Sequence, residues 1–190
     1  MAVRITGGIL RGRQVKIPEG IIRPAMDRMR ESVFAALGDL SGYSFLDIFS
    51  GSGIIALEAA SRGAIYIEAV EMDPIKRKIL LENVKISPVR INCRFISAEL
   101  YIKRAKKAFD VIFCDPPFPY KYKSLLIKTI AASPLLRSGS RLLIHRPREE
   151  ITGIAAENPE LRTIENQNKN LILENSREYG RSIVDFYRFL

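Results

Sequence analysis

An apolar run is followed directly by four residues that together could bind an amino group: Asp115, Pro116, Pro117 and Phe118. Two successive prolines stop a strand and fix φ, so the Asp115 carboxylate and the Pro116 carbonyl would be rigidly placed. An exocyclic amine of a nucleic-acid base is a poor nucleophile, because its lone pair is delocalised into the ring. Two acceptors that bind its hydrogens turn the lone pair toward an electrophile, while Phe118 stacks on the base. We interpret these four residues as a catalytic turn; the alternative is an ordinary strand-ending turn.

A glycine-rich loop, Asp47 to Gly53, closes another apolar run and precedes a helical pattern. Gly51 and Gly53 permit a tight turn and a close approach by a ligand. With Ala56 they also fit the dinucleotide fingerprint, so the glycines alone leave the cofactor open. Asp47 favours S-adenosylmethionine, because a carboxylate repels a pyrophosphate and attracts a sulfonium and an ammonium. The alternative is that Asp47 only caps the loop by accepting from backbone N–H groups.

Acidic and small residues follow the next two strand candidates. Glu71 is placed to accept both hydroxyls of a ribose; alternatively it is exposed, and Asp73 merely caps the helix that begins at Pro74. Ser97 and Ala98 follow the third strand, where an adenine would lie. We therefore predict an S-adenosylmethionine site formed by Asp47, Phe49, Ser50, Gly51, Gly53, Glu71, Met72, Ser97, Ala98 and Asp115.

These residues are separated by short apolar runs that alternate with helical patterns, which predicts an α/β fold with a mostly parallel, doubly wound sheet. The expected strands are 44–49, 65–71, 91–96, 109–114 and 140–145, and the expected helices are 54–62, 74–86, 98–107 and 122–132.

Both ends of the chain depart from this alternation. Residues 3–7 and 13–17 predict a small N-terminal β-hairpin, and a loop through Pro24 precedes a helix with Asp27 as its N-cap. Residues 171–175 and 182–189 predict two antiparallel strands joined through residues 177–180. A parallel sheet that ends in an antiparallel hairpin is typical of methyltransferases rather than of nucleotide dehydrogenases.

Basic residues exceed acidic ones, and the excess is concentrated near the N-terminus. The chain has 30 Lys and Arg against 21 Asp and Glu, a net charge of +9. Such an excess favours a polyanionic partner, although a solvated basic surface would give the same count. For Arg30 an alternative to contact with RNA is an ion pair with Glu31 that orders a loop over the cofactor. The residues expected to contact RNA phosphates are Arg4, Arg11, Arg13, Lys16, Arg23, Arg28 and Arg30.

Nearly the whole chain resembles the RsmD-type methyltransferases, which methylate N2 of a guanine in 16S ribosomal RNA. Ala25 and Met26 stand where that family usually has threonines, and Ser97 stands where an Asp or Asn commonly meets the adenine. The matching segments are Arg4-Ile5-x-Gly7-Gly8, Arg11-Gly12-Arg13, Arg23-Pro24-x-x-Asp27-Arg28-x-Arg30-Glu31, Asp47 to Gly53, Leu57-Glu58-Ala59, Ser61-Arg62-Gly63, Glu71, Asp115 to Phe118 and Tyr179-Gly180.

The resemblance implies a Rossmann-like S-adenosylmethionine-dependent methyltransferase fold with a seven-stranded, mostly parallel sheet. It implies ribosomal RNA as the substrate, bound within a partly assembled small subunit. We expect one methyltransferase domain over 1–190, with a basic N-terminal hairpin or arm over 1–24 and the core over 25–190. We expect no metal, no membrane association and a cytoplasmic location.

Three other functions remain possible at this point. The same catalytic turn would serve an enzyme that methylates adenine N6 or cytosine N4, although the chain is short for one with a DNA-recognition domain. An NAD-dependent oxidoreductase is disfavoured by Asp47 and by the two prolines. An assembly factor that binds RNA without catalysis is compatible with the sequence.

The sequence also allows predictions for the two cysteines and the histidine. Cys93 and Cys114 lack metal-ligand spacing and lie in apolar runs, which predicts buried, reduced thiols. His145, the only histidine, is expected to be a strand-end polar residue rather than a catalytic base.

Overall fold

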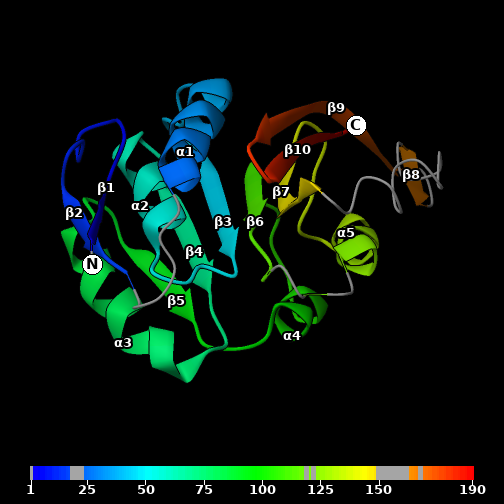
Figure 1. Ribbon diagram of the computed structural model, residues 1–190. Coiled ribbons are helices and arrows are strands. Elements are labelled where there is room, and N and C mark those ends of the chain that lie inside the picture. The colour runs from blue at the N-terminus through cyan, green and yellow to red at the C-terminus, as the bar shows by residue number, and fades with distance from the viewer. Residues whose placement is uncertain (1, 18–23, 118–119, 121–122, 149–162, 167–168) are drawn as a thin grey trace. The chain divides into compact units, whose positions relative to one another are not determined.

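Strands and helices alternate from Ser44 to Pro147 in the computed structural model, after an N-terminal hairpin and one helix, and three further strands follow (Figure 1). The structure describes residues 2–17, 24–117, 120, 123–148, 163–166 and 169–190. The chain divides into two compact units, residues 1–98 and 99–190, which are described in turn. The expectation of a single domain stays a prediction.

The first unit contains the hairpin, three helices and three parallel strands. Strand β4 pairs in parallel with β3 on one side and with β5 on the other. This arrangement brings the carboxyl ends of the three strands to one edge, where open α/β sheets bind ligands. Its elements are β1 (Ala2–Arg4), β2 (Gln14–Lys16), α1 (Pro24–Leu37), β3 (Ser44–Ile48), α2 (Ile54–Ser61), β4 (Tyr66–Val70), α3 (Pro74–Asn83), a 3₁₀ turn η1 (Val84–Ile86) and β5 (Ile91–Arg94).

The second unit holds the remaining strands in the order β6-β7-β10-β9-β8. The β6–β7 pair is parallel, whereas β10 is antiparallel to both β7 and β9. The seven expected sheet strands are therefore present in the two units, and β8 is an additional edge strand. The elements are α4 (Ala98–Lys103), which begins at the unit boundary, β6 (Val111–Cys114), α5 (Lys123–Ala131), β7 (Arg141–Pro147), β8 (Thr163–Asn166), β9 (Lys169–Tyr179) and β10 (Ser182–Phe189).

The start of one helix and the end of another differ from the sequence expectation. Helix α1 begins at Pro24, because proline suits the first helical position, so Asp27 lies in the first turn instead of capping the helix. Helix α4 ends at Lys103 rather than at residue 107. The chain then turns away, and the Phe109 N–H donates to the Leu135 carbonyl before β6 begins.

The C-terminal hairpin is also longer and tighter than expected. Strand β9 extends through residues 177–179, which had been assigned to the connection, because its ladder with β10 continues to the Ser182–Tyr179 pair. Only two residues, Gly180 and Arg181, connect the strands, and Gly180 has φ of 62°. A positive φ of this kind is favourable for glycine in a two-residue turn.

The two cysteines differ in their burial. Both cysteines are free; Cys114 is buried as expected, but Cys93 is only half-buried. Burial, followed by the charge of Asp47, raises the pKa of the Cys93 thiol.

Within the described ranges, none of the helices has both the length and the apolar character needed to span a bilayer.

Candidate active site

The glycine-rich loop is a tightly bonded turn between β3 and α2. The Ser50 N–H donates to the Val70 carbonyl at 2.9 Å, and the Gly53 N–H donates to the Ser50 carbonyl at 2.7 Å. Phe49 is the one described non-glycine residue with positive φ, at 68°, which places backbone strain at this loop. Gly53, with φ of 80°, is required by packing as well, because an added Cβ would lie 2.5 Å from Cδ1 of Leu80.

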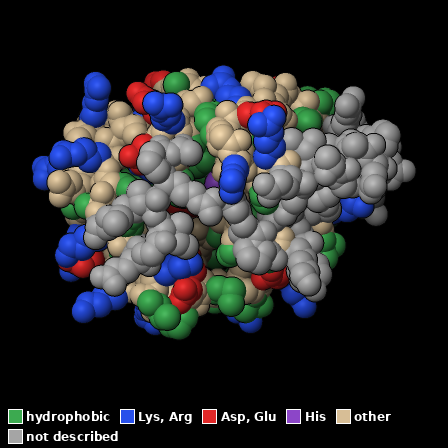
Figure 2. Space-filling model, in the orientation of Figure 1, with side chains coloured by type: hydrophobic (Ala, Val, Ile, Leu, Met, Phe, Trp, Pro, Cys, Tyr) green, Lys and Arg blue, Asp and Glu red, His purple; other side chains and the backbone are tan. Residues whose placement is uncertain are grey.

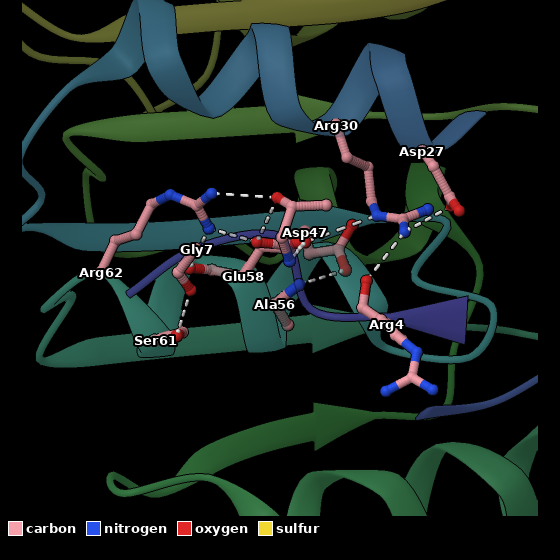
Figure 3. Close-up of polar contacts among 10 residues, drawn as sticks. Arg4, Gly7, Asp27, Arg30, Asp47, Ala56, Glu58, Ser61 and Arg62 are labelled. Carbon is pink, nitrogen blue, oxygen red and sulfur yellow. Dashed lines mark hydrogen bonds and ion pairs between the residues drawn. The ribbon is translucent and has the colours of Figure 1, made fainter. Parts of the chain in front are cut away.

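Asp47 lies inside the unit, beneath this loop. Its side chain is buried, and Oδ2 accepts a hydrogen bond from the Ala56 N–H in the first turn of α2 at 3.2 Å (Figure 3). The alternative interpretation, in which Asp47 caps the loop, therefore has a contact that supports it. The contact of Asp47 with a cofactor stays a prediction.

Glu71 directly follows β4 and is buried rather than exposed. Oε2 accepts from the Gly51 N–H and Oε1 from the Asp73 N–H, each at 2.8 Å. Asp73 caps α3, because its carboxylate accepts from the Ile75 N–H at 2.9 Å. Glu71 therefore joins the glycine loop to the end of β4, which places it at the edge where the sequence predicts a ribose.

The remaining cofactor candidates of the first unit lie along the same strand ends. Ser97 is half-buried and Ala98 is buried, at the start of α4. Met72, next to Glu71, is 63% exposed, which leaves its thioether accessible to a ligand. Among the described residues, the Phe49 carbonyl oxygen is the one atom within 4 Å of an ideal Cβ position on Gly51, so these residues leave open space beside this glycine.

These observations test whether the strand ends fit S-adenosylmethionine. Two buried carboxylates lie near the carboxyl ends of neighbouring strands, Asp47 within β3 and Glu71 directly after β4. The described residues leave open space beside Gly51. A cofactor that carries a sulfonium and an ammonium is favoured by carboxylates, whereas a pyrophosphate would be repelled by them. The residues therefore fit an adenosyl cofactor with a positive charge better than a dinucleotide.

The Asp-Pro-Pro turn lies at the carboxyl end of β6 in the second unit. The Asp115 side chain is 27% exposed, Pro116 is buried and Pro117 is exposed. The Tyr120 N–H donates to the Pro117 carbonyl at 2.8 Å, which closes the turn. Oδ1 of Asp115 lies 2.6 Å from Nδ1 of His145. Phe118, the predicted stacking residue, lies outside the described residues.

The sequence analysis expected His145 at the end of a strand and missed its contact with Asp115. It lies within β7 rather than at its end, it is buried, and it contacts the predicted catalytic carboxylate. The signal was available in the sequence: if 109–114 and 140–145 pair in parallel, then the polar residues at their carboxyl ends become neighbours.

The basic hairpin is docked on α2 by backbone and side-chain bonds. The hydroxyl of Ser61 donates to the Gly7 carbonyl at 2.6 Å and accepts from the Leu10 N–H at 2.8 Å. The Ile9 N–H donates to the Ser61 carbonyl at 2.8 Å. Gly8 is needed here, because an added Cβ would lie 1.9 Å from that same carbonyl oxygen. Part of the Ser61-Arg62-Gly63 motif therefore serves to hold the hairpin.

Glu58 is the centre of this attachment. Its carboxylate is fully buried and accepts from the Thr6 N–H at 2.7 Å and from the Thr6 hydroxyl at 3.1 Å. Arg62 donates to the same carboxylate, and Nε of Arg30 lies 3.5 Å from Oε1. Figure 3 shows the two guanidinium groups extending toward Glu58 from different elements. We call Thr6, Arg30, Glu58 and Arg62 the Glu58 cluster.

Arg30 is therefore corrected as an RNA-binding candidate. Its side chain is 3% exposed, and its Nη2 donates to Asp27 at 2.7 Å and to the Arg4 carbonyl at 3.2 Å. The alternative, an Arg30–Glu31 ion pair, is not found either: among the described residues, the carboxylates that Arg30 contacts are those of Asp27 and Glu58. The charge of Arg30 serves the attachment of the hairpin instead of a phosphate.

The other basic candidates are placed differently. Arg4, Arg11, Arg13 and Arg28 are exposed, and so is Lys16, whose Nζ pairs with Glu82 at 2.5 Å. Figure 2 shows several Lys and Arg side chains on the side of the molecule where the hairpin lies. Arg23 lies outside the described residues. Five of the seven candidates are thus accessible to a polyanion.

Comparisons with known proteins agree with this fold. The family model described as "Conserved hypothetical protein 95" matches residues 3–188. Ribosomal RNA small subunit methyltransferase D of Escherichia coli (strain K12) is 35% identical over 132 residues, 67% of this chain and 65% of that protein. The protein of the same name from Haemophilus influenzae is 29% identical over 78% of this chain and 80% of its own length. The alignment with the E. coli protein thus spans slightly less than two thirds of that protein.

A solved structure matches along almost the whole length. The putative methyltransferase yhhF from E. coli superposes with a TM-score of 0.81 at 25% identity, covering 99% of this chain and 98% of that one. The fold and the site define the class of Rossmann-like S-adenosylmethionine-dependent methyltransferases. Within that class, this chain belongs to the family matched over residues 3–188, that of the RsmD-type ribosomal RNA methyltransferases.

Proposed function

We propose that this chain methylates the exocyclic N2 amine of a guanine in 16S ribosomal RNA, with S-adenosylmethionine as the methyl donor. The observation that carries the proposal is the position of Asp115, partly exposed at the end of β6 and followed by two prolines, in a chain of this family. The family relatives named as small-subunit methyltransferases support ribosomal RNA as the substrate.

In this proposal the two units have separate roles. The first unit binds the cofactor: Glu71 accepts from the ribose hydroxyls, while Asp47 and the loop from Phe49 to Gly53 hold the charged end. When bound, S-adenosylmethionine supplies an electrophilic methyl group on a sulfonium. Ser97, Ala98 and Met72 line the adenine.

The second unit prepares the amine. The Asp115 carboxylate and the Pro116 carbonyl accept the two amine hydrogens, so that the nitrogen lone pair leaves conjugation with the ring. Asp115 and Pro116 would thereby direct the lone pair at the methyl group that bound S-adenosylmethionine would supply, with the electrons of its S–C bond left on sulfur. The methylated nitrogen then gives up one proton to water. Phe118 stacks on the base and fixes its plane.

The substrate in this proposal is RNA within a partly assembled small subunit in the cytoplasm. A guanine in a helix must be unstacked before its amine reaches the turn, and an assembly particle can present it in a loop. The exposed arginines of the hairpin contact phosphates, which position the RNA without reading its sequence.

Gene deletion tests the function directly. We expect 16S ribosomal RNA from the deletion strain to lack one N2-methylguanine that mass spectrometry detects in the parent strain, with restoration by the wild-type gene. Loss of a methyl group from adenine N6 or cytosine N4 would reassign the base. An unchanged methylation map would refute the proposal.

Glu71→Gln tests the cofactor half. Because hydrogen bonds to a charged acceptor contribute about 1.5–3 kcal/mol, we expect the Kd for S-adenosylmethionine to rise about tenfold or more, as measured by calorimetry. Glu68→Gln is the matched control, since Glu68 is a buried glutamate within β4, three residues before Glu71, and its carboxylate pairs with Arg94. Equal affinity in the two variants would remove Glu71 from the ribose site.

The double variant Arg11→Ala and Arg13→Ala tests the hairpin as an RNA surface. We expect weaker RNA binding and a smaller dependence of log K on log salt, by about 0.7–0.9 for each phosphate that the variant no longer neutralises. The control is Lys103→Ala with Lys106→Ala, which removes the same charge from exposed positions at and beyond the end of α4. An unaltered salt slope in the hairpin variant would exclude Arg11 and Arg13 from the interface.

A further inference from the structure

The parallel pairing of β6 and β7 brings Asp115 beside His145. Cys114 pairs with Ile144 in this ladder, so the next residue of each strand lies at the same level of the sheet. Nδ1 of His145 lies 2.6 Å from Oδ1 of Asp115, a short hydrogen bond for a nitrogen donor. The contact is therefore set by the sheet register rather than by a flexible loop.

The two partners differ in their access to solvent. The His145 side chain is 3% exposed, whereas that of Asp115 is 27% exposed. His145 is also held from its other side, since it pairs with Val184 of β10. An imidazole enclosed in this way has little rotational freedom, so it is suited to fixing the orientation of a more exposed group.

The chemistry of the pair assigns the hydrogen. A carboxylate only accepts, so Nδ1 is the donor in this contact. The bond occupies Oδ1 of Asp115 and leaves Oδ2 as the oxygen that can accept from a substrate. It also opposes rotation of the carboxylate about its Cβ–Cγ bond, which would move the acceptor out of line with an incoming amine.

We propose that His145 is a positioning residue that holds the Asp115 carboxylate, so that Oδ2 accepts the amine hydrogen of the target base. This inference rests on the proposed role of Asp115. His145 exchanges no proton with the substrate here. Its contribution is to the alignment of the transferred methyl group and the nitrogen, so it acts on kcat rather than on binding.

Two substitutions of similar size separate this role from packing. In His145→Asn, the side-chain amide places an N–H near the position of Nδ1, whereas His145→Leu fills the same space without a donor. We expect the Leu variant to lose about 10- to 100-fold in kcat, the range for removing a residue that orients a functional group. We expect the Asn variant to stay within about threefold of the wild type. KM for RNA and the Kd for S-adenosylmethionine should change little in both.

A double-mutant cycle with Asp115→Asn tests whether His145 acts through Asp115. If it does, His145→Leu should lower the single-turnover rate about 10- to 100-fold in the wild-type background but less than about threefold in the Asp115→Asn background. Equal losses in both backgrounds would assign His145 to packing alone. If the Leu variant does not fold, His145→Gln replaces it, because that longer amide places its N–H away from Nδ1.

The outcomes distinguish this inference from the proposed function. A wild-type chain that transfers no methyl group to RNA or to the small-subunit particle refutes the function. A wild-type chain that is active, with His145→Leu equally active and folded, overturns only the role of His145. Retained activity in the Asn variant together with reduced activity in the Leu variant supports it.

Discussion

Replacing Asp115 by alanine is expected to lower methyl transfer about 10²- to 10³-fold, because the change removes an acceptor that aligns the amine. The Kd for S-adenosylmethionine should stay within about threefold, because the other predicted cofactor residues, which all belong to the first unit, remain. Asp115 has the position that this role requires. It directly follows β6, its side chain is 27% exposed, and Pro116 and Pro117 fix the backbone behind it. Since one oxygen of Asp115 already accepts from His145, the substitution would remove a pre-oriented acceptor and not a mobile one.

The measurement is single-turnover transfer of a labelled methyl group to small-subunit particles from a deletion strain, with cofactor binding followed separately by calorimetry. Asp110→Ala is the matched control, since Asp110 immediately precedes β6 and pairs with Arg137. The control variant should transfer methyl groups at a rate close to that of the wild type. Transfer by Asp115→Ala at the wild-type rate would show that another group orients the amine.

The strand ends could be predicted because the constraint on them is local. An apolar run buried on both faces, followed by a glycine or a proline, can only be a short parallel strand that stops there. Asp47, Glu71 and Asp115 were therefore assigned to the ends of β3, β4 and β6 from the sequence. The capping role of Asp73 followed in the same way, because Pro74 marks the first helical position.

Contacts between distant segments were not predictable from local patterns. Arg30 belongs to a basic run and has the composition of a phosphate contact, yet it is buried against Glu58, which lies 28 positions further along the chain. The contact of His145 with Asp115 depends on the β6–β7 register, so it follows from the sequence only once the parallel pairing of these two strands is assumed. The continuation of β9 to Tyr179 likewise depends on its pairing with β10.

The contacts of the Glu58 cluster show that the motifs around it attach the hairpin to the rest of the first unit. Glu58, Ser61 and Arg62 follow the glycine loop in sequence, and they bond to residues 6–10 of the hairpin. Asn83 makes a second link, since it donates to the carbonyls of both Lys16 in β2 and Ser52 in the glycine loop. The hairpin with the exposed arginines is thus attached to the elements that form the cofactor loop.

Removal of the Glu58 carboxylate is expected to have the largest effect on stability. In Glu58→Ala, the guanidinium of Arg30 remains 3% exposed without the carboxylate beneath it, and the Thr6 donors lose their acceptor. Breaking a buried ion pair from one side costs about 3–5 kcal/mol. Here the Arg62 guanidinium, which is 14% exposed, loses the Glu58 carboxylate, while Arg30 keeps its contact with Asp27. We expect a decrease of that size in the free energy of unfolding, measured by urea denaturation with the slope m compared between variants.

Two further variants make this prediction specific. Glu174→Gln removes an acid from the Arg188–Glu174 pair, whose side chains are each 41% exposed, and should cost no more than about 1 kcal/mol. Thr6→Val removes only the hydroxyl donor of the cluster and should cost about 1 kcal/mol. Amide hydrogen exchange should increase in the hairpin of Glu58→Ala before it increases in β6 and β7. Because the hairpin carries Arg11, RNA binding should weaken in Glu58→Ala together with the increase in hydrogen exchange. A Glu58→Ala variant as stable as the wild type would mean that other contacts hold the hairpin.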